Sequence, residues 1–204
     1  MNLGGLDIAS TTGAAVLRDG KITTQTFKAA GKKRFLDRDD DKSIDAVRMG
    51  QAGRSFEDFV MAWLIENAIG HLAVEAPLNT NFQRKRAVVD TGAEWAGKSV
   101  SYETTGGAPL ATFFKIHMLE GIACTVATRL NIPVVFVNQG TWRKAFLGNG
   151  KPKDAKHEAK KMCERLGIEC SSLDAAESAG VVYWLNTVLN PYGARANDLF
   201  KTPA

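Results

Sequence analysis

With 204 residues, 45% of them hydrophobic, the chain is long enough to bury one full core, so a single domain over residues 1–204 is expected. Its 26 basic and 22 acidic residues give a net charge of +4, which mildly favours a polyanionic partner over an acidic or neutral one. The three cysteines are odd in number and lack C-x-x-C spacing, which argues against a zinc site and a disulfide framework.

The start of the chain lacks the basic and apolar regions of a secretory signal. No run of residues approaches the roughly 18 apolar positions that a membrane-spanning helix needs. We therefore expect a cytoplasmic protein without a membrane partner.

Residues 3–28 predict a three-stranded antiparallel meander. Period-two alternation places Leu6 and Ile8 on one face of the first strand, and an Asp-Gly pair at residues 19–20 predicts the second turn. The alternation leaves Asp7 on the opposite face, although an acid inside a strand is costly to bury. Asp7 is therefore either a solvated outer-face residue or a group kept for a cation.

A helix and a strand are predicted next, after a charged connection at residues 29–42. Ser55 predicts the helix start, because apolar side chains follow at the spacing of one buried face: Phe56, Phe59, Val60, Trp63 and Leu64. Gly70 predicts the helix end, and residues 71–76 predict a short apolar strand. A helix that feeds a strand is typical of a crossover, so this strand should lie parallel to the first. It carries a second acid, Glu75.

Residues 78–109 lack periodicity and hold four glycines, which predicts a long loop of the kind that is usually functional or mobile. The loop contains an aromatic residue and a basic run: Phe82, Arg84, Lys85 and Arg86. Helical intervals of apolar residues predict a helix over 110–130, where His117 is expected to be a core or interface residue. Residues 132–137 then predict a buried β-branched strand.

A basic segment follows this strand. Residues 141–147 predict a short helix, and a glycine-rich break at 148–150 precedes a longer helix that ends near Leu166. Between Arg143 and Lys161 there are seven basic residues and two acidic ones. A solvated helix face is one explanation, but a glycine-rich break inside the segment favours contact with phosphates. Lys151, Lys153 and Lys156 are among the basic residues of this segment.

The last predicted helix, residues 174–189, begins with two acids on one face, Asp174 and Glu177. One explanation is a capping box, with Asp174 as N-cap and Glu177 at the third helical position. That explanation does not account for Asp7 and Glu75. In a fold that layers this helix on the sheet, these two acids could lie beside Asp174 and Glu177. Four carboxylates brought together without positively charged side chains repel one another, and a bound divalent cation commonly relieves this repulsion.

This order of elements and acids resembles the RNase H-like nuclease fold. The segments LDIAST, AVEAPL and DAAESA resemble RuvC-type Holliday-junction resolvases, especially phage and prophage forms, with element order matching over about residues 3–189. The resemblance implies an α/β fold with a mixed five-stranded sheet, made of three antiparallel strands and two parallel crossover strands, flanked by helices.

The resemblance also implies a chemistry. Asp7 would bridge two Mg²⁺ ions, for which Mn²⁺ could substitute, Glu75 would ligate one of them, and Asp174 and Glu177 would complete the shell. The ions would promote hydrolysis of a DNA phosphodiester to a 5′ phosphate and a 3′ hydroxyl, with no nucleotide cofactor. Many family members have Asp where this chain has Glu177.

Further implications concern DNA and partners. Lys153 and Lys156 fall in the region where the family places lysines that contact phosphates, and we expect Lys151 to bind DNA beside them. The substrate would be a branched, four-way DNA junction, into whose centre Phe82, or less favourably Leu78, would wedge. Family members act as symmetric homodimers, and the helix over 110–130 is the candidate interface because His117 and Met118 widen its apolar face. The segment 78–109 is the expected junction-facing loop, although its residues do not match the family.

Three other functions compete with junction cleavage. Residues 7–13 also resemble the first phosphate loop of actin-like kinases and ATPases, which would make the chain a phosphotransferase fragment, although it is short for a two-domain clamp. A junction-binding protein that does not cleave, and a plain RNase H with a similar metal site, are the other two.

Overall fold

The structure is a computed structural model that describes residues 1–9, 11–28, 46–77, 84–90, 99–105 and 110–191. For residues 84–90, 99–105 and 110–111 it describes the backbone alone. The charged connection predicted at 29–42 lies outside the described residues. Among the helices that are described, none has the length and apolar character needed to cross a membrane.

A five-stranded mixed sheet forms the centre of the fold, as the sequence predicted. Its strand order is β3-β2-β1-β4-β7, with β1–β2 and β2–β3 antiparallel and β1–β4 and β4–β7 parallel. The strands are β1 (Asn2–Asp7), β2 (Thr12–Arg18), β3 (Lys21–Phe27), β4 (Ile69–Glu75) and β7 (Val134–Val137). Since β1 and β4 are parallel neighbours, Asp7 and Glu75 both lie at the carboxyl edge of the sheet.

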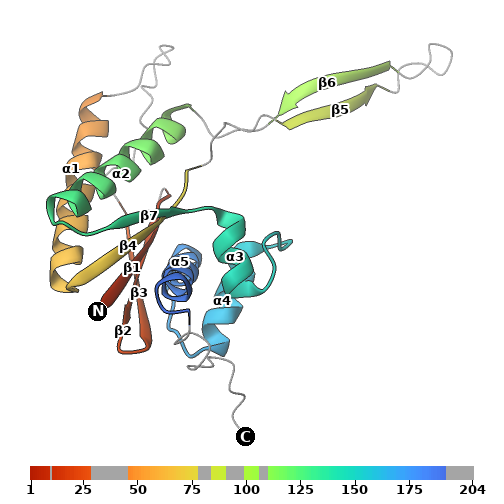
Figure 1. The fold of residues 1–204 in the computed structure, drawn as a ribbon. Coiled ribbons are helices and arrows are strands. Elements are labelled where there is room, and N and C mark those ends of the chain that lie inside the picture. Colours follow the sequence, from red (N-terminus) through yellow and green to blue (C-terminus); the bar gives the residue numbers. More distant parts are fainter. Residues whose placement is uncertain (10, 29–45, 78–83, 91–98, 106–109, 192–204) are drawn as a thin grey trace, which may run out of the picture.

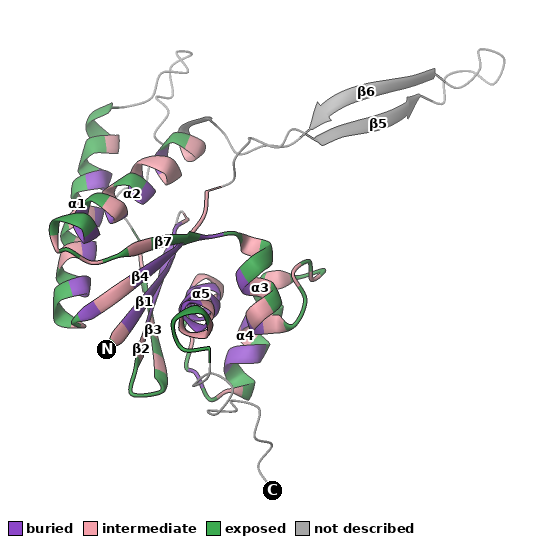
Figure 2. Cartoon of the chain, viewed as in Figure 1, coloured by how far each residue is buried: buried purple, intermediate pink, exposed green. Residues whose placement is uncertain are grey.

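Helices cover both faces of this sheet (Figure 1). On one face, α1 (Ala46–Glu66) packs against α2 (Leu110–Arg129) over a core that includes Phe56, Leu72 and Val126. On the other face lie α3 (Gln139–Leu147), α4 (Ala155–Arg165) and α5 (Leu173–Leu189). Figure 2 shows that α5 is buried along most of its length, as expected for the middle helix of this layer.

Helix α1 is longer at its start than predicted. It begins at Ala46, not near Ser55, because tertiary packing supports its first turns: a Cβ on Gly53 would lie 3.1 Å from Ile122 of α2. Its end is also different, since the helix stops at Glu66 and Ala68 takes a left-handed φ of 48°. Gly70 is instead part of β4, where a Cβ would lie 2.7 Å from the side chain of Met1.

Strand β7 is shorter and more exposed than the buried strand predicted over 132–137. It forms one edge of the sheet, and Val135 and Phe136 are 41% and 51% exposed. The β-branched composition that indicated burial is equally compatible with an edge position, which the sequence alone does not reveal.

The segment predicted as a loop over 78–109 contains a β-hairpin. Strands β5 (Arg84–Asp90) and β6 (Ser99–Thr105) pair antiparallel as a separate two-stranded sheet, with Arg84 opposite Thr105 and Asp90 opposite Ser99. Figure 1 shows this hairpin apart from the five-stranded sheet. The prediction of a loop was therefore wrong for these residues, because cross-strand pairing does not require a strong period-two pattern on a two-stranded ribbon.

Two glycines allow α5 to lie unusually close to the sheet. A Cβ on Gly5 of β1 would lie 2.6 Å from the backbone nitrogen of Val182, and one on Gly13 of β2 would overlap the backbone carbonyl of Asp174. Gly13 is also the register partner of Asp7. The first turn of α5 is therefore held directly against the strand ends that carry Asp7.

We predict that Gly180→Ala destabilises the protein and that Gly121→Ala does not. Both glycines are inside helices, but a Cβ on Gly180 would lie 2.5 Å from the Trp142 ring, whereas Gly121 faces open space. Overpacking should cost Gly180→Ala about 1–3 kcal/mol. The control should gain up to about 1 kcal/mol from helix propensity. Urea denaturation followed by circular dichroism measures both, and equal stability of the two variants would contradict the tight contact.

Candidate metal centre

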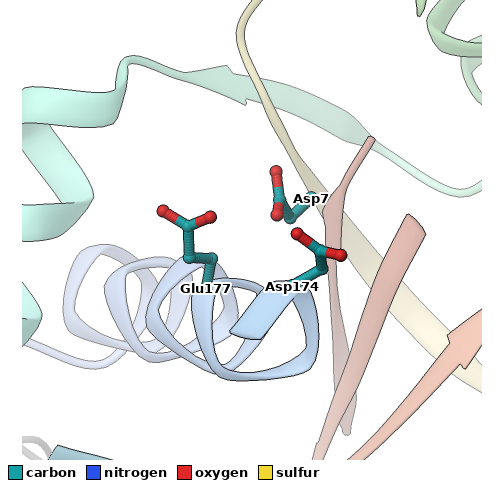
Figure 3. A group of neighbouring side chains, drawn as sticks. All are labelled: Asp7, Asp174 and Glu177. Carbon is teal, nitrogen blue, oxygen red and sulfur yellow. The ribbon is translucent and has the colours of Figure 1, made fainter. Parts of the chain in front are cut away.

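Three of the four predicted acids converge at the carboxyl edge of the sheet. One carboxylate oxygen from each of Asp7, Asp174 and Glu177 lies within 4.8 Å of the other two. Asp7 comes from the end of β1, and the other two come from the first turns of α5, which lies over that strand end (Figure 3). Residues from the two ends of the sequence are thus brought together by the packing of α5 on β1.

The capping-box explanation of the α5 acids is wrong. The N-cap is Ser172, whose side chain accepts a hydrogen bond from the backbone N–H of Ala175. Asp174 therefore lies within the first turn, and Glu177 is only 3% exposed. The cap uses neither acid, and Figure 3 shows both carboxylates on the side of α5 that faces Asp7.

Asp7 is in an environment that disfavours a lone negative charge. It is 5% exposed, and its Oδ2 is buried without a hydrogen-bond partner among the described residues. Burial raises the pKa of Asp7 well above its ordinary value, and the charges of Glu75 and Glu177 raise it further. A hard cation bound by oxygen ligands would satisfy Oδ2 and stabilise the charged form. The donor set therefore fits a divalent metal ion.

Glu75 lies beside this cluster but is held separately. Its Oε1 accepts a hydrogen bond from Gln139 Nε2 at 2.6 Å, and its Oε2 accepts one from Trp142 Nε1 at 2.7 Å. Burial raises the pKa of Glu75, the two hydrogen bonds oppose that rise, and the charge of Glu177 adds to it. Glu75 thus interacts electrostatically with the other acids, although it is not one of the three whose oxygens converge.

Two cations partly balance the acids. Lys156 Nζ lies 2.6 Å from Asp174 Oδ1 and 3.1 Å from Glu177 Oε2, and Arg143 contacts Glu177 Oε1 at 3.1 Å. Burial acts to lower the pKa of Lys156, but the hydrogen bond to Asp174 and the charge of Glu177 outweigh it and raise that pKa. The predicted phosphate ligand Lys156 is therefore part of the acidic site itself.

Sequence reasoning missed the contribution of α3. Three side chains of α3 donate hydrogen bonds to acids of the site: Gln139, Trp142 and Arg143. Their i, i+3, i+4 spacing was a signal in the sequence, because it places them on one face of a helix. It also missed Glu120 of α2, which is 4% exposed and 3.3 Å from His117 Nδ1. Burial and the charge of Glu75 raise the pKa of Glu120 to about 7.

The other predicted DNA contacts are placed only in part. Lys151 and Lys153 are exposed in the connection between α3 and α4, next to the helix that carries Lys156. Phe82 and Leu78 lie outside the described residues. Arg84, Lys85 and Arg86 begin β5, for which the backbone alone is described.

Comparison with known proteins identifies the fold. No family model matches the chain, and the search of curated proteins found no match. Among solved structures, RuvC of Thermus thermophilus in complex with a Holliday junction substrate is similar over 95% of this chain and 97% of that chain, with 12% identity and a TM-score of 0.56. A second Thermus thermophilus RuvC structure covers 93% and 96%, with 17% identity and a TM-score of 0.53.

The chain therefore has the RuvC fold, a member of the RNase H-like class, over nearly its whole length. This confirms the fold class expected from the order of strands, helices and acids. At such low identities the likeness establishes the fold alone.

We predict that Lys156→Met binds divalent cations more tightly than the wild type in the absence of DNA. The ammonium of Lys156 forms ion pairs with two of the three converging carboxylates and so competes with a metal ion. Removing it should raise the affinity for Mn²⁺ by on the order of tenfold. Isothermal titration calorimetry measures the affinity. Lys161→Met, an equal charge change at an exposed position of α4, is the control. Unchanged affinity in Lys156→Met would show that this side chain does not compete with the metal.

Proposed function

We propose that the protein is a metal-dependent endonuclease that cleaves four-way DNA junctions. The observation that supports this most directly is the convergence of Asp7, Asp174 and Glu177 on a RuvC fold. The related Thermus thermophilus RuvC was solved in complex with a Holliday junction substrate, and we extend that substrate class to this chain. The net charge of +4 and the basic connection between α3 and α4 agree with a polyanionic substrate.

The metal would be Mg²⁺, with Mn²⁺ as a substitute and two ions in each active site. Asp7, Asp174 and Glu177 would hold the metal, and Glu75 would complete the ligand set. Such ions would supply an activated water and stabilisation of the leaving 3′ oxygen, and hydrolysis of the phosphodiester would give a 5′ phosphate and a 3′ hydroxyl.

The protein's own side chains would bring the scissile phosphate to this centre. Lys156 is next to the acids and 46% exposed, so its ammonium can contact a phosphate oxygen that approaches from solvent. The exposed Lys151 and Lys153 would contact neighbouring phosphates of the same strand. The half-buried Arg143, paired with Glu177, would hold that carboxylate in place and add positive potential. The junction-facing role of Phe82, Arg84, Lys85 and Arg86 stays a prediction.

A homodimer would suit the proposed substrate, because a four-way junction offers two strands to cut related by two-fold symmetry. Within the protomer, Met118 packs into the core beneath α1, and His117 pairs with Glu120. Contacts within the protomer therefore explain the apolar character of this face at His117 and Met118 without a second subunit. The choice of α2 as the dimer interface rests instead on its remaining exposed apolar surface, such as the 46% exposed Phe114.

We expect Asp7→Asn and Glu177→Gln each to reduce nicking of a synthetic four-way junction by more than about 100-fold in Mg²⁺. Each substitution removes a charged oxygen from the converging set, a larger loss than that of an outer-shell partner. The rate of strand scission on a labelled junction is the measurement. Asp58→Asn, the same chemical change on an exposed face of α1, should keep the wild-type rate.

Other outcomes of this experiment would favour the competing functions. Junction binding without scission in Mg²⁺ or Mn²⁺ would indicate an architectural protein. Faster cleavage of an RNA–DNA hybrid than of the junction would indicate an RNase H, and ATP turnover without DNA would indicate a phosphotransferase. Wild-type cleavage rates in Asp7→Asn and Glu177→Gln would remove both residues from the mechanism.

We expect Lys151→Ala and Lys153→Ala to weaken junction binding and its salt dependence. If each lysine contacts one phosphate, the slope of log affinity against log salt should fall by about 0.9 for each substitution. Fluorescence anisotropy in the Asp7→Asn background measures binding without cleavage. Lys21→Ala, at the β2–β3 turn, removes the same charge at the opposite end of the strands and should keep the wild-type slope. An equal change in slope for Lys21→Ala would indicate a nonspecific charge effect.

A further inference from the structure

Helix α3 presents one face of hydrogen-bond donors to the acids of the metal centre. Gln139, Trp142 and Arg143 lie at positions i, i+3 and i+4 and therefore share a face. The first two donate to Glu75, and Arg143 donates to Glu177. The helix follows β7 directly, and β7 pairs with β4, so the end of β7 places the start of α3 beside the end of β4.

Glu75 is fixed by both of its oxygens. The donor distances of 2.6 and 2.7 Å are those of strong hydrogen bonds to a charged acceptor. A carboxylate oxygen has two lone pairs, so each oxygen of Glu75 can accept a hydrogen bond and still bind a cation. The two bonds therefore set the plane and direction of the carboxylate without using up its capacity as a ligand.

The Trp142 ring is itself immobilised by packing. Its side chain is fully buried, and it stands against Gly180 of α5, where any Cβ would lie 2.5 Å from the ring. The absence of a side chain at position 180 lets the indole pack directly against α5 while its N–H donates to Glu75. A ring held in this way cannot follow Glu75 if the carboxylate turns, so the carboxylate adopts the direction that the ring dictates.

We propose that Trp142 and Gln139 are positioning residues that hold Glu75 in the orientation needed to complete the metal centre. Glu75 carries the same charge as its neighbours Asp7 and Glu177, so a free side chain would turn away from them. The two donors oppose that turn. This inference rests on the proposed function, because it assigns Glu75 to the metal that the other three acids would hold.

The test is the affinity for Mn²⁺ in the absence of DNA, measured by isothermal titration calorimetry. Trp142→Phe removes the N–H and keeps an aromatic ring, and Gln139→Met removes the amide at nearly constant length. Each should weaken Mn²⁺ binding by about 10–100-fold, the range for lost outer-shell partners of metal ligands. Phe146→Leu, which perturbs the same buried layer without touching Glu75, should lower thermal stability and leave the affinity unchanged.

A double-mutant cycle separates positioning from a general structural effect. If the donors act through Glu75, adding Trp142→Phe or Gln139→Met to Glu75→Gln should change the affinity less than about twofold. Full additivity in the cycle would overturn the proposal. Wild-type affinity for Mn²⁺ in both single variants would also overturn it. If Trp142→Phe fails to fold, wild-type affinity in Gln139→Met alone would overturn it.

The metal centre itself is tested separately by Asp7→Asn. Loss of Mn²⁺ binding in Asp7→Asn, with normal binding in the two α3 variants, would refute the positioning role and leave the proposed nuclease intact. Normal Mn²⁺ binding in Asp7→Asn would refute the metal centre, and the proposed nuclease would fail with it.

Discussion

The site depends on the close approach of α5 to the sheet. Gly5 and Gly13 have no side chains where the helix backbone passes, so Asp174 and Glu177 reach the end of the strand that carries Asp7. A Cβ at either glycine would push the helix outward and separate carboxylates that come from the two ends of the sequence. Backbone contact between a helix and two strands, rather than any polar interaction, therefore creates the acidic cluster.

Once formed, the cluster needs positive charge and hydrogen-bond donors to persist. Lys156 and Arg143 supply charge to the α5 acids, and α3 supplies donors to Glu75. Asp7 alone keeps a buried oxygen without a partner among the described residues, which is the feature that most clearly calls for a bound cation. Under the proposed function, the same cations that balance the acids would also attract the phosphates of a nucleic acid, so electrostatic balance and substrate attraction would use one set of residues.

Much of the fold could be predicted from the sequence because local patterns agreed with the tertiary structure. The meander, the order of crossovers and the final acidic helix follow from turn residues, apolar periodicity and the resemblance carried by three short segments. The start of α1, the exposure of β7 and the β5–β6 hairpin could not be predicted. Each depends on how distant parts of the chain are arranged. The early turns of α1 pack on α2 at Gly53, Phe136 is exposed because β7 is at the edge of the sheet, and the hairpin requires Arg84 to pair with Thr105.

For the site, the sequence by itself determined which carboxylates exist and on which elements they lie, because strand alternation and helix spacing are local properties of the chain. The tertiary structure decided which of them converge and that Glu75 is held by α3. It also decided that Lys156 and Arg143 lie among the acids. These facts depend on distances between elements far apart in sequence, and such distances are set only when glycines, rings and strands pack together.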